Sequence, residues 1–386
     1  MQVETATVGK QRTFRRYFTR EPVMLALLAV VAVVLFTAVT GLSRIYHAQQ
    51  ASLGNRWFNR GVTDLEAKRY DRAVIEFRAA LVYSRDDYVY QLNLAEALVG
   101  EKRTPEAYAY LINLWDREPE NGVVNLELAR ISAERGLTNQ ALRYFHNAIY
   151  ATWPGDQEIQ RRDTRLELIN YLLKINSKPQ AESELIALAA NLGNDPVQQQ
   201  NLGDLFLRAQ DYERALAAFR TTLRADSHNQ QAMAGAGLAA FALGRYDLAQ
   251  HYLQEAVNSD HNDTQSAERL KLTQLVLQLD PFRRGLSATD RTRIVIDDFG
   301  TAGDRLKVCG GTNGYSLGTG SPTSLSETWT KMKPQITPWG IRRDPDLVES
   351  AMDLVFNIER QDSTTCGTPT GKDEALLLIA KLHEGS

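Results

Sequence analysis

Six alanines recur along the middle of this chain at a nearly constant interval, and this period constrains the fold more than any other feature. Successive members stand 34, 34, 40, 34 and 34 residues apart. The six are Ala73, Ala107, Ala141, Ala181, Ala215 and Ala249. A fixed period of about 20–50 residues is typical of arrays in which one supersecondary unit is repeated and stacked on its neighbours.

Two further columns of residues keep the same phase. Large apolar residues stand four positions after each alanine: Phe77, Leu111, Phe145, Leu185, Phe219 and Leu253. Twelve positions before each alanine stand Gly61, Ala95, Ala129, Ile169, Gly203 and Gly237, of which only the isoleucine is not small. Small residues let two antiparallel helices approach closely, and the large residue fills the space toward the next pair. The columns therefore predict stacked helix pairs, because one pair alone cannot bury its apolar face.

The pattern resembles the tetratricopeptide repeat, whose consensus has a Trp, a Leu-Gly pair, a Tyr, then Ala, Phe, Ala and Pro. The first unit matches at Trp57, Gly61, Tyr70, Ala73, Phe77 and Ala80, and the fifth at Leu202, Gly203, Tyr212, Ala215 and Phe219. The resemblance covers residues 54–263 and implies six repeats in an all-α, right-handed helical solenoid. Residues 264–280 have the place of its capping helix. The fourth unit departs from the pattern, since six extra residues precede it and Lys178-Pro179 replaces the Tyr-containing turn, so we expect a kink there.

In this family, ligands usually lie in the concave groove formed by the first helices of the repeats. By register, the groove positions are Phe58, Val62, Leu92, Glu96, Leu126, Arg130, Asn170, Gln200, Asp204, Arg208 and Leu238. Their mixed lining suits an extended or helical protein segment. A subclass that grips a terminal carboxylate uses a set of Lys and Asn residues, of which this chain has only Asn170. For each position, packing between repeats is the alternative to ligand binding.

An apolar segment near the N-terminus is the second constraint. No charged residue occurs from residue 22 to residue 43. Twenty helical residues at about 1.5 Å each span about 30 Å, the thickness of a bilayer's hydrocarbon core, so we expect a transmembrane helix at 22–43. The nearby basic residues are Lys10, Arg12, Arg15, Arg16 and Arg20 before it, and Arg44 and Arg56 after it. The positive-inside rule then predicts a cytoplasmic tail at 1–21, with the juxtamembrane linker at 44–53 and all that follows extracytoplasmic, in the periplasm of a bacterium.

Two alternatives to a membrane anchor exist. A cleaved signal peptide has an apolar region of about 7–15 residues and a small-residue cleavage site. This segment is longer, and no such site follows it. Arg15-Arg16 resembles part of a twin-arginine export signal, but such signals usually have a weaker apolar core. We therefore predict an uncleaved signal anchor.

Residues 281–386 lack the 34-residue period and resemble no known family. Capping boxes and apolar stripes predict helices, joined in part by a glycine-rich loop at 310–320. The chain has two cysteines, Cys309 and Cys366. In an oxidising compartment we expect them to form a disulfide, worth about 4 kcal/mol in the chain-entropy model. Two separate buried thiols are the alternative.

Motifs for catalysis are missing from the sequence. The segment from Gly367 to Lys372 has three residues between its glycines, where a phosphate-binding loop needs four, and Asp373 replaces the magnesium-binding Ser or Thr. The histidines form no H-E-x-x-H, and no G-x-S-x-G occurs. A net charge of −3 argues against a nucleic-acid partner. We expect no enzyme activity, no cofactor and no metal.

These features predict a membrane-anchored scaffold that holds a protein or peptide partner in the repeat groove. The alternative is that residues 281–386 form a small enzyme or ligand-binding module whose substrate the repeats recruit. A polar cluster around Trp329, Trp339 and Arg342 in a deep pocket would favour it. Self-association into a homo-oligomer through the groove also stays open.

Overall fold

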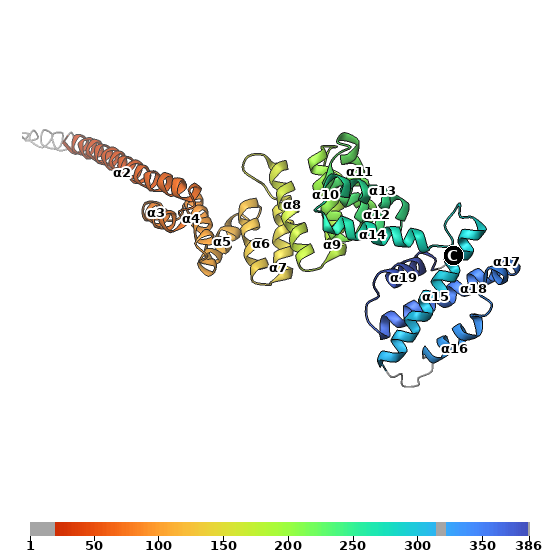
Figure 1. Ribbon diagram of the computed structural model, residues 1–386. Coiled ribbons are helices and arrows are strands. Elements are labelled where there is room, and N and C mark those ends of the chain that lie inside the picture. The colour runs from red at the N-terminus through yellow and green to blue at the C-terminus, as the bar shows by residue number, and fades with distance from the viewer. Residues whose placement is uncertain (1–19, 314–321, 385–386) are drawn as a thin grey trace, which may run out of the picture. The chain divides into compact units, whose positions relative to one another are not determined.

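The computed structural model describes residues 20–313 and 322–384, and within these ranges the chain is a succession of helices (Figure 1). The extended pairing found there is one isolated bridge, between Asn121 and Thr152. The predicted all-α fold class is thus confirmed. The helices are α2 (Arg20–Glu66), α3 (Tyr70–Tyr83), α4 (Tyr88–Gly100), α5 (Thr104–Arg117), α6 (Gly122–Glu134), α7 (Thr138–Tyr150), α8 (Gln157–Lys174), α9 (Lys178–Ala189), α10 (Pro196–Ala209), α11 (Tyr212–Ala225), α12 (Gln230–Ala242), α13 (Tyr246–Ser259), α14 (Thr264–Leu279), α15 (Ala288–Asn313), α16 (Pro322–Met332), α17 (Pro338–Arg343), α18 (Asp346–Thr365) and α19 (Lys372–Leu382).

Helix α2 joins the apolar N-terminal segment to the first repeat without a break. Residues 44–53, predicted as a linker, are therefore helical. Between Gly41 and Gly54 the sequence has neither glycine nor proline, so no residue there stops a helix. The stretch Val23–Glu66 is long and apolar enough to cross a membrane, with a mean hydropathy of 2.8 in its most apolar window. A signal sequence has the same properties, and of the basic residues that precede the span only Arg20 lies within the described ranges.

The three columns of the sequence pattern meet inside the helix pairs. All six alanines of the period have no exposed surface. A Cβ atom added to Gly61 would lie 2.6 Å from the Phe77 ring, and one added to Gly203 would lie 2.7 Å from the Phe219 ring. These distances are far below a van der Waals contact, so the small residue is required where the large residue of the same repeat packs against it.

The chain forms two compact units, residues 1–168 and 169–386. In the first unit, α2 pairs with α3, α4 with α5, and α6 with α7. In the second unit, α10 pairs with α11 and α12 with α13, and α14 packs against α13. The border falls within the fourth repeat, where the sequence departs from the pattern. The predicted kink at this repeat stays a prediction.

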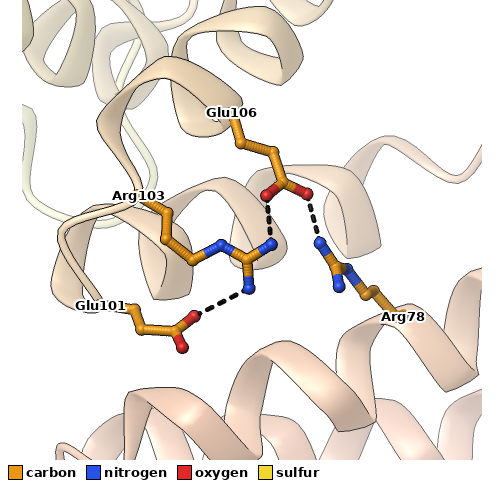
Figure 2. Close-up of polar contacts among 4 residues, drawn as sticks. All are labelled: Arg78, Glu101, Arg103 and Glu106. Carbon is orange, nitrogen blue, oxygen red and sulfur yellow. Dashed lines mark hydrogen bonds and ion pairs between the residues drawn. The ribbon is translucent and has the colours of Figure 1, made fainter.

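Neighbouring repeats are also joined by ion pairs between their second helices. Figure 2 shows that Arg78 of α3 pairs with Glu106 of α5. Glu106 also pairs with Arg103, and Arg103 lies 3.2 Å from Glu101. The corresponding pairs in the second unit are Arg214–Glu182 at 3.1 Å and Arg245–Glu213 at 2.6 Å. Because these side chains are partly exposed to solvent, which screens their charges, each pair contributes only about 0–1 kcal/mol.

The C-terminal region shares its core with the end of the repeats. Tyr246 of α13 and Val276 of α14 belong to the same buried cluster as Phe299 of α15, Val355 of α18 and Ile379 of α19. The predicted boundary at residue 280 therefore does not separate two cores. Helix α14 caps the repeats on one side and supports the C-terminal helices on the other.

The predicted glycine-rich loop begins later than expected. Helix α15 continues to Asn313, so residues 310–313 are helical, and residues 314–320 of the predicted loop lie outside the described ranges. Cys309, near the end of α15, is 2% exposed and is joined in a disulfide to Cys366, with the two Cα atoms 5.7 Å apart. This separation is usual for a disulfide. The disulfide joins the last part of α15 to the residue that follows α18.

Candidate binding surface

The apolar groove positions of the first unit are mostly occupied by packing. Phe58 of α2 stacks on Tyr90, with 4.7 Å between ring centroids, and also contacts Phe77 at 5.7 Å. Leu126 of α6 is 8% exposed. Val62 and Leu92 are half-buried. Phe58 and Leu126 thus serve contacts between helices, the alternative that the sequence left open, whereas Leu92 still reaches the surface.

The charged groove positions of the first unit belong to one network of ions. The Arg130 guanidinium on α6 lies 2.9 Å from a carboxylate oxygen of Glu167 on α8, and it also pairs with Glu127 one turn earlier. Burial, followed by the charge of Glu127, raises the pKa of Glu96 to about 7, and Arg130 opposes this. Burial also raises the pKa of Glu127, against the pull of the same arginine. Arg130 therefore neutralises acidic neighbours and is engaged within the fold.

The polar groove positions of the second unit lie at the surface. Asn170, Asp204 and Arg208 are exposed, and an Arg208 Nη donates to Asn170 Oδ1 at 3.0 Å. Gln200 is half-buried, donates to Gln231 and accepts from Asn229 at 3.0 Å. Leu238 of α12 is half-buried. We call Asn170, Gln200, Asp204 and Arg208 the polar row. It offers one negative charge, one positive charge and two neutral amides that can donate and accept hydrogen bonds.

Four residues of these networks were absent from the predicted groove: Glu127, Glu167, Asn229 and Gln231. Glu127 stands three positions before Arg130, a spacing that pairs opposite charges on one helix face, so this contact was readable in the sequence. Glu167 stands 37 residues from Arg130, and no local pattern indicates that pair. Only the folded chain brings these two side chains together.

The residues proposed for an alternative C-terminal site do not converge. Trp329 is 8% exposed, stacks on Phe299 with centroids 5.5 Å apart and donates from Nε1 to the Phe299 carbonyl at 2.9 Å. Trp339 is 68% exposed, and Arg342 is exposed as well. Trp329 is thus a core residue, whereas Trp339 and Arg342 lie at the surface.

One group of potential metal ligands exists in the described part of the chain. The sulfur atoms of Cys309 and Cys366 and a carboxylate oxygen of Asp362 lie within 4.8 Å of one another. Because the two sulfurs are bonded to each other, neither is a thiolate, which is the form that binds metal. With the disulfide formed, Asp362 is the one member of this group that could bind a metal ion.

Stacked helix pairs define a helical-repeat protein. Residues 201–267 match the model of the tetratricopeptide repeat family, so this chain carries tetratricopeptide repeats, as the sequence pattern predicted. This fold indicates a protein–protein interaction scaffold, a class that is generally not enzymatic. A search of curated proteins returns no match.

Several solved structures are similar to this chain. YrrB, described as a repeat protein with an unusual peptide-binding site, is 16% identical with a TM-score of 0.40, over 50% of this chain and 95% of its own. The pilF protein of Pseudomonas aeruginosa is 15% identical with a TM-score of 0.40, over 57% and 97%. Part of a repeat protein of Cytophaga hutchinsonii is 12% identical with a TM-score of 0.45, over 62% and 92%. At these identities and TM-scores, the similarities carry no information about a partner.

Proposed function

We propose that this chain is a scaffold anchored in a membrane by residues 22–43, and that its repeats capture a segment of a partner protein on the outer side. The exposed polar row of the second unit carries the proposal. Asp204 and Arg208 stand one helical turn apart on α10, and the Arg208 guanidinium bonds Asn170 rather than that carboxylate. Opposite charges presented one turn apart on one first helix, beside an amide of the neighbouring first helix, suit the selective docking of a polar segment of defined register.

The decisive experiment is chemical crosslinking of the full chain in its native membrane, followed by mass spectrometry of the captured proteins. The double variant Asp204→Lys with Arg208→Glu reverses both charges of the row. The matched control, Glu255→Lys with Arg220→Glu, reverses two exposed charges on second helices. We expect the row variant to lose a specific crosslinked protein that the control retains. Equal capture by both variants would refute binding at the row, and a captured second copy would make the partner the chain itself.

Arg130 is a poor choice for this test, although it is also a predicted groove residue. Its guanidinium holds Glu127 and Glu167, so a reversal to Glu would gather like charges in a half-buried site. A loss of capture would then report unfolding as readily as a lost contact. Arg208 is exposed, and its reversal perturbs only one hydrogen bond to Asn170.

Membrane orientation is tested separately by thiol labelling with a membrane-impermeant maleimide. A cysteine placed in the tail by Thr5→Cys should be labelled only after lysis, whereas Val82→Cys on exposed α3 surface should be labelled in intact spheroplasts. Labelling of both or of the tail alone would contradict the proposed topology. The intact mass of the purified protein decides whether the apolar segment is retained.

A further inference from the structure

An open cavity of about 960 Å³ lies in the first unit, at the N-terminal ends of the first helices α4 and α6. Its wall includes Leu92, a predicted groove position, together with Tyr88 and Val123. The other side is formed by the turn before α6 and by residues 152–154. A cavity of this size is within the range that accepts a bulky side chain and its neighbours.

The insertion that breaks the repeat period builds one wall of this cavity. The Thr152 N–H donates to the Glu120 carbonyl, and the Gly122 N–H donates to the Thr152 carbonyl, each at 2.9 Å. The insertion thereby closes back on the turn before α6.

Trp153 fixes this wall in position. Its indole Nε1 donates to the Ala148 carbonyl at 2.8 Å, and the residue is 6% exposed. A Cβ atom on Gly122 would lie 2.4 Å from the indole ring, so the ring rests directly on the backbone of α6. The wall is therefore rigid before a ligand arrives, which lowers the entropy that binding costs.

The cavity combines an apolar surface with an acidic rim. Val89 is 51% exposed, and with Leu92 and Pro154 it offers an apolar surface to solvent. Glu118 and Glu120, on either side of Pro119, are exposed at the rim. Burial, followed by the charge of Glu118, raises the pKa of Tyr88 to about 12, so its hydroxyl stays neutral at physiological pH.

We propose that this cavity binds an extended segment of the partner protein through a large apolar side chain flanked by lysine or arginine. The inference rests on the proposed function, because it names the chemistry of the segment that the same repeats capture. The apolar side chain enters between Leu92 and Pro154, and the basic side chain pairs with Glu118 or Glu120. An acidic segment is excluded by repulsion from the same two carboxylates.

The test is selection of a phage-displayed library of random twelve-residue peptides on the full chain in nanodiscs. We expect enriched peptides to carry a large apolar residue beside lysine or arginine. Acidic consensus peptides, or no enrichment over the starting library, would overturn the proposal. The affinity of a synthetic selected peptide is then measured by fluorescence anisotropy on four variants.

Two matched pairs of variants locate the peptide. Val89→Lys places a positive charge in the cavity and should weaken binding by at least about tenfold, whereas Val82→Lys, on an exposed valine of α3, should not. Glu118→Gln with Glu120→Gln should also weaken binding about tenfold, and Asp71→Asn with Asp116→Asn should leave it unchanged. Equal effects within either pair would overturn the assignment. All six positions changed are on the surface or at its edge, so folding is checked by one thermal melt for each variant.

The outcome separates this inference from the proposed function. If crosslinking depends on the polar row but the selected peptides ignore Val89 and the two glutamates, the cavity assignment fails and the scaffold stands. If the peptides bind the cavity and crosslinking ignores the row, partner capture at the row fails and the cavity assignment stands.

Discussion

In the first repeats, the buried Glu127 and the half-buried Glu96 lie near the Arg130 guanidinium, which neutralises acidic side chains from more than one helix. In the described part of the C-terminal region, three buried acids have cations nearby but no hydrogen bond from them. Asp298 of α15 and Glu359 and Asp362 of α18 have no exposed surface, and none of their carboxylate oxygens has a hydrogen-bond partner among the described residues.

The electrostatic consequence differs accordingly. Burial, followed by the charge of Asp297, raises the pKa of Asp298 to about 8, although Lys372 opposes it. Burial, followed by the charge of Asp373, raises the pKa of Glu359 to about 8, against the pull of Arg305. These carboxyls are therefore largely protonated at neutral pH, because an ionised carboxylate in the core costs more than keeping the proton.

The difference shows two ways of stabilising helices that bury polar groups. A repeat contacts only its neighbours, so a charge on one first helix is matched by a charge on the next. The C-terminal region has no such periodic neighbour, and it combines protonated acids with a covalent link between α15 and α18. Its stability should therefore depend on redox state and pH more than that of the first repeats.

The largest effect is expected from the disulfide. The bond closes a loop with a sequence separation of 57, so replacing both cysteines by alanine should lower the free energy of unfolding of the C-terminal region by about 4 kcal/mol. Region-resolved hydrogen exchange in urea measures it, and reductant added to the native chain is the control. Alkylation with and without reductant first establishes the thiol count. Equal protection of α15 and α18 in both proteins would remove this half of the comparison.

A second prediction concerns pH. The pKa of Asp298 is raised in the folded chain above its model value of 3.8, so its stabilising contribution is complete below about pH 4 and is lost as pH rises to about 8. We expect protection factors of α15 and α18 to fall between pH 5 and pH 8. Asp298→Asn removes the ionisation of this side chain, so it should reduce that fall.

Glu96→Gln in the first unit is the matched variant. The Glu96 carboxyl of the wild-type chain has a pKa of about 7, and that of Asp298 is about 8. The loss of stability with rising pH that Glu96 causes should therefore end about one pH unit lower than the loss that Asp298 causes. If hydrogen-exchange protection depends on pH in the same way in both regions, the acids near Arg130 and the buried acids of α15 and α18 do not differ as described.

The close packing of the repeats gives the third prediction. Ala215→Phe places a ring where the wild-type side chain has no exposed surface, so it should destabilise the fifth repeat by about 1–3 kcal/mol through overpacking. Ala217→Phe, two positions along on the exposed face of α11, should change stability by less than about 0.5 kcal/mol. Chemical denaturation compares the two. An unchanged Ala215→Phe variant would show that the register of the repeats is wrong.

The smallest effect is expected at the exposed ion pairs between second helices. Arg78 and Glu106 are 45% and 33% exposed, so a double-mutant cycle with alanine at both positions should give a coupling energy below about 1 kcal/mol (Figure 2). The coupling should weaken in high salt. A larger, salt-insensitive value would mean that surface charges stabilise the stack as much as the buried columns do.

Much of the fold could be predicted because residues of the same size and polarity recur at a fixed period along the repeats. Ala107 and Ala249 are buried at the predicted contacts, and the close approach of Gly61 to Phe77 is the one that the columns describe. The helical linker was missed because residues 44–53 lie between the uncharged span and the first repeat and belong to neither pattern. Yet nothing between them interrupts a helix, so α2 is continuous.

The sequence predicted the binding positions less well than it predicted the fold. Register places Phe58 and Arg208 equally on first helices, but one is stacked on Tyr90 and the other is exposed. The period indicates which helix carries a residue and not which neighbour covers it. The cavity beside Trp153 was missed for a related reason, since an insertion reads only as a break in the pattern.

The sequence by itself determined the local properties of this protein: an apolar helix near the N-terminus, stacked helix pairs with buried alanines at a fixed period, and two cysteines in the C-terminal region. Each follows from composition and spacing along the chain, because propensity and periodic burial act over one or two turns. The tertiary structure alone decided that Glu167 meets Arg130, that the insertion folds onto the turn before α6, and that Asp298 and Glu359 share one core. Those contacts join residues far apart in sequence, and their free energies depend on desolvation and on neighbours that only packing brings together.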